Sequence, residues 1–150
     1  MTAIPFEDYS AICNTKARYC RLLDEKDWDA YSDVFTEDVV LDTRPSGGYE
    51  VTGRNELMKM VCESIGSAIT VHQVHLPEMT RVDDDNVAVI WAMFDRVIWD
   101  DDKAKQSGRK SLSGYGHYRE QYRRCDDGQW RIARTTLTRL HIELEDYTAE

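Results

Sequence analysis

The amino-acid sequence predicts one α+β domain, spanning residues 1–150, with a mostly antiparallel sheet. Apolar residues recur at helical spacing in the first part of the chain, whereas the second part consists of long β-rich stretches separated by short polar turns. Helices followed by consecutive strands are typical of the α+β class. Because neither a repeat nor a linker interrupts the chain, we expect a single domain.

Three helices are predicted in the N-terminal part. The first runs from about Phe6 to Asp24, and the third, capped by Gly53 or Asn55, extends to about Gly66. The apolar stripe of the first helix comprises Ile12, Tyr19 and Leu23. A short second helix after Lys26-Asp27 carries Trp28, Tyr31 and Phe35 on one side. Between the second and third helices we expect a brief strand, Val39–Asp42, and a loop, Arg44–Gly53.

The remaining chain predicts strands joined by polar turns. The expected strands are Ile69–Leu76 (ending at Pro77), Met79–Val82, Val87–Trp99, Ser111–Cys125 and Gln129–Glu143. The charged stretch Asp100–Arg109 is predicted to be a mobile loop. Residues 87–99 are apolar on both alternating faces, which indicates a central strand. Because three helices cannot cover both faces, we expect a homodimer or homotrimer that packs sheet against sheet.

Composition and charge exclude several classes of protein. A hydrophobic content of 41% and a charged content of 31% are typical of globular proteins. We expect neither a membrane span nor a signal peptide, and the net charge of -9 argues against nucleic-acid binding. Cys13 and Cys20 would lie about 10 Å apart on the first helix, too far for a disulfide. The four cysteines therefore predict reduced thiols in a cytoplasmic protein.

Several stretches of the sequence resemble a known family over nearly the whole chain. They are Ala17–Asp24, Trp28 and Phe35 before Asp38, Gly53-Arg54, Thr70–His75, Gly114–Tyr118 and Asp127–Ile132. Together with the order of elements, they are similar to the SnoaL-like branch of the NTF2-like superfamily. The resemblance implies a cone in which a strongly curved sheet and three N-terminal helices enclose a pocket. It does not by itself imply one function, because the superfamily includes enzymes and non-catalytic binding or assembly modules.

The resemblance also implies catalytic residues. Scytalone dehydratase, bile-acid 7α-dehydratase and hexachlorocyclohexane dehydrochlorinase pair a histidine with a helix-borne aspartate. The matching positions are His72 and Asp24, and Tyr19 matches the helix tyrosine of the bile-acid enzyme. The dehydrochlorinase has a lysine near the tyrosine position. This chain has Tyr19 there and Lys16 one turn before it, so dehydrochlorination is the less natural interpretation. A neutral histidine oriented by a carboxylate suits removal of a proton next to a carbonyl. The alternative is a satisfied core pair without catalytic function.

Tyr19 and Asp24 lie about 140° apart around a regular helix. Both reach one pocket if the helix crosses its mouth or if Asp24 lies beyond the last regular turn, and residues 24–27 favour the second arrangement.

Further residues are candidates for substrate binding. Asp95 ends an apolar row that contains Trp91, and it either contacts substrate or pairs with Arg134 or Arg139 in the core. The resemblance implies an arginine on the last strand, which either of these two could supply. Tyr115 and His117 share one face of their strand, opposite Tyr118, and would bind substrate if that face is concave. The glycines at 114 and 116 indicate a bend or a close approach of the backbone.

Metal and cofactor sites are not predicted. His72 and His75 are three apart on a strand and point to opposite faces, so they cannot bind one ion. No nucleotide or phosphate fingerprint is present. The sequence therefore predicts a cofactor-independent lyase or isomerase, dehydratase- or cyclase-like, acting on a hydrophobic oxygenated small molecule. The alternative is a non-catalytic NTF2-like ligand-binding or assembly module.

Overall fold

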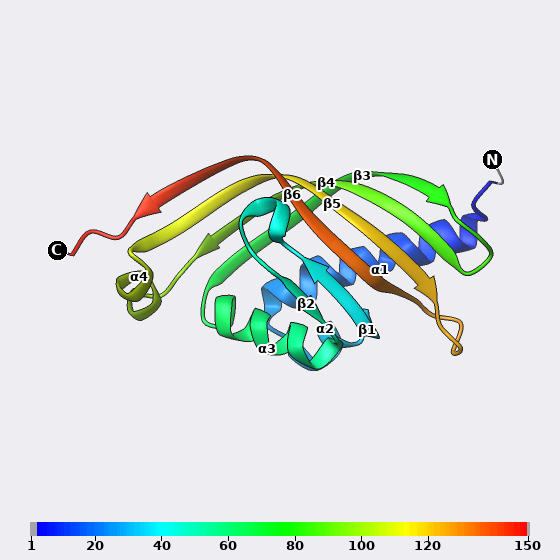
Figure 1. Cartoon of the computed structure of the whole chain (residues 1–150), viewed down its shortest axis with the longest axis horizontal. Helices are drawn as coiled ribbons and strands as arrows, with labels where there is room; N and C mark the ends of the chain where they lie inside the picture. The colour runs from blue at the N-terminus through cyan, green and yellow to red at the C-terminus, as the bar shows by residue number, and fades with distance from the viewer. Residues whose placement is uncertain (1–2, 150) are drawn as a thin grey trace.

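The computed structural model describes residues 3–149, which form one six-stranded sheet with helices α1 to α3 on one side (Figure 1). The elements are α1 (Phe6–Glu25), α2 (Trp28–Ser32), β1 (Phe35–Asp42), the 3-10 turn η1 (Arg44–Ser46), β2 (Glu50–Thr52), α3 (Arg54–Ile65), β3 (Ile69–Arg81), β4 (Asn86–Ile98), α4 (Asp101–Ser107), β5 (Arg109–Arg124) and β6 (Trp130–Asp146). The strand order is β2-β1-β6-β5-β4-β3. This arrangement confirms the predicted α+β class and NTF2-like fold.

The sheet has an inner face, which carries α1, and an outer face that carries no helix (Figure 1). Alternate residues of β4 from Val87 to Val97 are buried on the inner face, and the residues between them are half-exposed on the outer face. On α1 the buried stripe includes Ile12, Tyr19 and Leu23, as predicted. The stripe packs on the inner face, where the rings of Tyr19, Tyr31 and Phe35 meet at centroid distances of 5.1 to 5.9 Å.

Glycines allow the sheet to bend over α1. A Cβ on Gly116 would lie 2.0 Å from the Thr138 carbonyl oxygen, and one on Gly114 would lie 2.1 Å from Nη1 of Arg139. The β5–β6 register shifts between Tyr115 and Gly116. The predicted close approach at these two glycines is therefore confirmed.

Local structure differs from the sequence expectation at several points. Asp101–Ser107 is a helix and not a mobile loop, because Asp100 accepts a hydrogen bond from the Lys103 N–H at 3.0 Å and Gly108 ends the helix at φ 71. β3 continues past Pro77 through a register shift between Val74 and Pro77.

The N-terminal strand region is also more regular than predicted. β1 begins at Phe35 and pairs with β6 in parallel, and the expected loop at 44–53 contains η1 and β2.

All four cysteines are free thiols. Among the described residues, no helix combines the length and the apolar character that crossing a bilayer requires.

The outer face leads to our first prediction, which concerns assembly. Ile90 and Phe94 are only half-buried there, and Tyr115 is 44% exposed. Because this apolar surface lacks a covering layer among residues 3–149, we expect a homodimer or homotrimer formed by outer faces. Sedimentation velocity at micromolar concentration should give the oligomer, and Ile90→Glu should give a folded monomer. A wild-type monomer would contradict this prediction.

Candidate active site

Asp24 and His72 form a hydrogen-bonded pair between the end of α1 and the start of β3. Oδ1 of Asp24 lies 2.7 Å from Nδ1 of His72, and Oδ2 accepts the His72 backbone N–H at 2.8 Å. The Thr70 hydroxyl donates to Oδ1 at 2.9 Å. The carboxylate thus holds both the ring and the backbone of His72, whose side chain is only 6% exposed.

This geometry defines the tautomer of His72. A carboxylate accepts hydrogen bonds and does not donate them, so the hydrogen of the neutral ring lies on Nδ1. The lone pair of the ring is therefore on Nε2, which is free to accept a proton. An oriented histidine with a carboxylate behind it is the arrangement that general base catalysis requires.

The position of Asp24 differs from the expectation that it lies beyond the last regular turn of α1. Asp24 lies inside the last helical turn, which ends at Glu25, and not beyond it. Lys26 ends the helix in the left-handed conformation, with φ 62 and ψ 28. β3 packs along α1, so His72 comes to the helix end and Asp24 does not need to leave the helix.

Asp95 and Arg139 form a second buried pair on the inner face. The two guanidinium Nη atoms of Arg139 donate to the two carboxylate oxygens of Asp95 at 2.6 and 2.8 Å. Asp95 is directly opposite His72 in the β3–β4 register. Burial lowers the pKa of Arg139, but the hydrogen bonds and charge of Asp95 outweigh it and the net pKa is raised. Of the two arginines left open by the sequence, Arg139 is therefore the one on the inner face.

Tyr19 lies beside a buried ion pair that the sequence did not predict. Lys16 Nζ contacts Glu120 Oε1 at 2.6 Å, and both side chains are 0% exposed. The ammonium also lies 3.8 Å from the ring centroids of Tyr19 and Tyr118. Burial, followed by the negative charge of Glu120, raises the pKa of Tyr19 well above its usual range, so Tyr19 stays protonated.

The sequence does contain a signal for this pair. Lys16 falls on the buried stripe of α1, and Glu120 alternates with Tyr118 and Tyr122 on the inner face of β5.

Other residues proposed from the sequence do not join this cluster. Arg134 pairs with Asp42 at 3.1 Å and Glu50 at 3.3 Å near β1 and β2. Tyr115 and His117 lie on the outer face, on the other side of the sheet from the Asp24–His72 pair, and Tyr115 stacks against His141.

Trp91 and His75 differ in their exposure to solvent. Trp91 is buried on the inner face opposite Tyr118, whereas His75 is exposed. In the described part of the chain, no group of three His, Cys, Asp or Glu side chains converges as metal ligands would.

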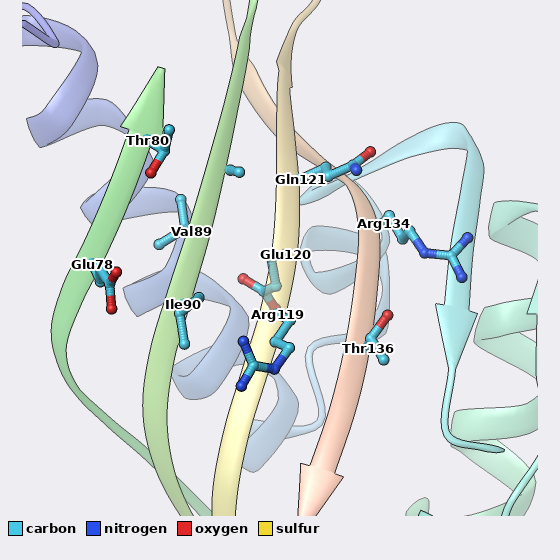
Figure 2. A pocket seen from close by; sticks show the side chains of 10 residues that line it. Glu78, Thr80, Val89, Ile90, Arg119, Glu120, Gln121, Arg134 and Thr136 are labelled. Atoms are coloured by element: carbon cyan, nitrogen blue, oxygen red, sulfur yellow. The ribbon is translucent and has the colours of Figure 1, made fainter. Parts of the chain in front are cut away.

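Five hollows of the chain between residues 3 and 149 lie away from His72. One of about 290 Å³ is on the outer face of β3 to β6, with α1 behind the sheet in the view of Figure 2. Its lining includes Glu78, Ile90, Arg119, Gln121 and Arg134. None of the five hollows includes Asp24, His72 or Tyr19. Beside the dyad, the inner face is occupied by aromatic side chains.

The Asp95–Arg139 pair gives a second prediction. Asp95→Asn leaves the guanidinium of Arg139, only 13% exposed, without its counter-charge. Because the Asn oxygen still accepts one of the two hydrogen bonds from Arg139, we expect a loss of about 2 kcal/mol, which lowers the melting temperature by about 4–8 °C. Thermal unfolding measures this, with Asp126→Asn in an exposed turn as the control. Unchanged stability together with weaker ligand binding would instead assign Asp95 to substrate.

Comparisons with known proteins agree with the fold. A curated protein of Gibberella zeae, FGR4, whose name proposes a cyclase, is 23% identical over 151 residues, covering 95% of this chain and 97% of the relative.

Two crystal structures from Novosphingobium aromaticivorans are similar at TM-scores of 0.81 and 0.77. Their names propose an aromatic ring hydroxylase and a scytalone dehydratase, respectively. The first is 24% identical and covers 97% of this chain and 96% of its own; the second is 22% identical and covers 95% and 89%. These likenesses establish the fold.

A family match covers most of the described chain. The SnoaL-like domain matches residues 5–136, which contain α1, all of β1 to β5 and the Asp24–His72 pair. This stretch is far more than half of the 150 residues. The chain belongs to the SnoaL-like domain family.

Proposed function

We propose that the protein is a cofactor-independent lyase or isomerase that uses His72 and Asp24 for general acid–base catalysis. The observation that carries this proposal is the 2.7 Å contact between Asp24 and Nδ1 of His72, which leaves Nε2 as a free acceptor. The proposed substrate is a hydrophobic oxygenated small molecule with an acidic hydrogen next to a carbonyl.

The proposed chemistry begins at Nε2 of His72. This atom removes the proton from the carbon next to the carbonyl, and the electron pair of the broken C–H bond forms the enolate. In a dehydration, the enolate expels the hydroxyl on the neighbouring carbon, which leaves as water with the proton returned by the imidazolium, while the Tyr19 hydroxyl assists as a hydrogen-bond donor. In a cyclisation, the same enolate attacks a second carbonyl of the molecule. The Asp24 carboxylate stabilises the imidazolium in both reactions.

The apolar character of the inner face supports a hydrophobic substrate. Beyond the Asp95–Arg139 pair, β-strand alternation places Leu112, Ile142 and Leu144 on the same face of the sheet as His72. Ile142 is 37% exposed and Leu144 is 48% exposed, so they offer apolar surface on the face of the sheet that carries the dyad. The names of similar proteins, which include a cyclase, a dehydratase and a dehydrochlorinase, are in keeping with this chemistry.

A second candidate function is a non-catalytic binding or assembly module. It is favoured by one observation: the inner face beside Tyr19 is filled by Tyr31, Phe35 and Tyr118, whose rings pack against Tyr19 at 5.4 to 5.9 Å. If the protein is nevertheless catalytic, either these aromatic side chains move, or the substrate binds on the part of the inner face that carries Leu144.

A screen for proton abstraction separates the two candidates. The wild-type protein is incubated in D₂O with a library of hydrophobic β-hydroxy carbonyl compounds, and mass spectrometry records loss of water and deuterium uptake at the carbon next to the carbonyl. We expect one or both for a subset of compounds, at unchanged rate in His75→Ala, which alters an exposed histidine of the same strand. Compounds that bind without any exchange would favour the binding module.

A further inference from the structure

We propose that Lys26 and Thr70 are positioning residues of the site, acting through Asp24 on the protonation of His72. This inference rests on the proposed function for its catalytic meaning, but its geometry stands independently. Lys26 Nζ donates to Thr70 Oγ1 at 2.8 Å, and Thr70 Oγ1 donates to Asp24 Oδ1 at 2.9 Å. Together with the Asp24–His72 contact, these bonds form a continuous chain of four side chains.

The ammonium of Lys26 determines the direction of this chain. An ammonium only donates hydrogen bonds, so it occupies a lone pair of the Thr70 oxygen. The Thr70 hydrogen must therefore point to its other neighbour, the Asp24 carboxylate. Asp24 then receives donors from Thr70 and from both the backbone and the ring of His72. A carboxylate satisfied in this way keeps its orientation and holds the hydrogen of His72 on Nδ1.

The backbone of Lys26 suggests that the side chain has a role beyond ending the helix. Lys26 is the only described residue other than glycine with a positive φ, at 62°. Glycine is the usual residue at this position because a Cβ costs about 1 kcal/mol there. A lysine in the strained conformation places its amine next to Asp24, and burial lowers its pKa while the charge of Asp24 opposes that effect.

The positive charge of Lys26 opposes protonation of His72. The other groups that face His72 stay in one charge state near neutrality. Asp95 of β4 is paired with Arg139 of β6. Burial raises the pKa of Tyr19 and Cys20 of α1 and of Tyr118 of β5, to about 11 for Cys20. Removal of the Lys26 ammonium should therefore make His72 easier to protonate.

Two variants of Lys26 separate positioning from a structural role. Lys26→Met removes the ammonium but keeps the Cβ strain, whereas Lys26→Gly removes the ammonium and relieves the strain. Both should raise the midpoint of the His72 ring titration by about half a pH unit, and the carboxylate of Asp24 should keep the ring hydrogen on Nδ1 in both. The melting temperature should move differently in the two, with Lys26→Gly the more stable. Nitrogen–proton NMR spectra of the full chain, assigned against His72→Ala, measure the ring titration without substrate.

Thr70 supplies the control for the chain of hydrogen bonds from Lys26 to His72. In a Thr70→Val background, Lys26→Met should shift the midpoint by less than half as much, whereas Thr70→Ser should behave like the wild type. Lys59→Met alters an exposed lysine and should leave the titration unchanged.

The outcomes for the inference and for the proposed function are distinct. Unchanged midpoints in both Lys26 variants would overturn the inference, whatever the activity. If the His72 titration responds to the Lys26 variants but the protein has no exchange activity, the proposed function is overturned and this inference remains.

Discussion

His72→Ala should abolish turnover of an identified substrate while the protein stays folded. The variant loses the nitrogen that the Asp24 carboxylate orients as a base, whereas the hydrogen bond from the backbone N–H of residue 72 to Asp24 remains. We expect a loss in kcat of at least 10²- to 10⁴-fold, the range associated with acid–base catalysis. Steady-state kinetics measures the loss, and circular dichroism verifies the fold.

Asp24→Asn should produce a loss of the same order by a different route. The ring remains, but the carboxylate that stabilises its protonated form is absent, and the amide can present an N–H in place of an acceptor to Nδ1. Because the two residues act as a unit, the double variant should be little worse than either single one.

A matched control is available on the same strand. His75→Ala removes an exposed imidazole three residues away and should retain wild-type activity. The dyad would be refuted by a folded His72→Ala protein that keeps most of its activity. An additive double variant would show that the two side chains contribute separately, and it would exclude the orienting role of Asp24.

Lys16→Met should be among the most destabilising single substitutions in the chain. Glu120 would remain fully buried with its charge uncompensated, and removal of one partner of a buried pair typically costs about 3–5 kcal/mol. The two Glu120 oxygens accept further hydrogen bonds, from Thr135 at 3.0 Å and from Tyr122 at 2.6 Å. Urea unfolding with linear extrapolation measures the change in the free energy of unfolding.

The double variant Lys16→Met/Glu120→Gln tests the cause. The neutral amide accepts a hydrogen bond through its one oxygen and can donate from its nitrogen to the other hydroxyl, so it should recover most of the stability that Lys16→Met loses. Arg21→Met is the control because the Arg21–Glu25 pair is exposed on both sides and should contribute almost nothing. Equal losses in the single and double variants would show that lost packing around Lys16, and not the unpaired charge, is responsible.

Much of the fold follows from local patterns in the sequence. The α1 stripe, the long strands and the glycines at 114 and 116 were predicted, because residue spacing at periods of 3.6 and 2 reports directly on which side chains are buried. The α4 helix was missed although its Asp100 cap and Gly108 end are local signals, since its charged composition favoured a loop. The parallel pairing of β1 with β6 is not a local property, because it joins segments about a hundred residues apart.

For the site, the sequence by itself determined the residue types and the helix or strand that carries each one. Asp24 at the end of α1 and His72 near the start of β3 were matched through the family resemblance, and the structure brings them within 2.7 Å. Only the tertiary structure decided that Arg139 and not Arg134 pairs with Asp95, and that Tyr115 and His117 face outward. The physical reason is that a strand pattern shows which residues share a face, but the side of the sheet on which the helices pack is determined by contacts between distant segments.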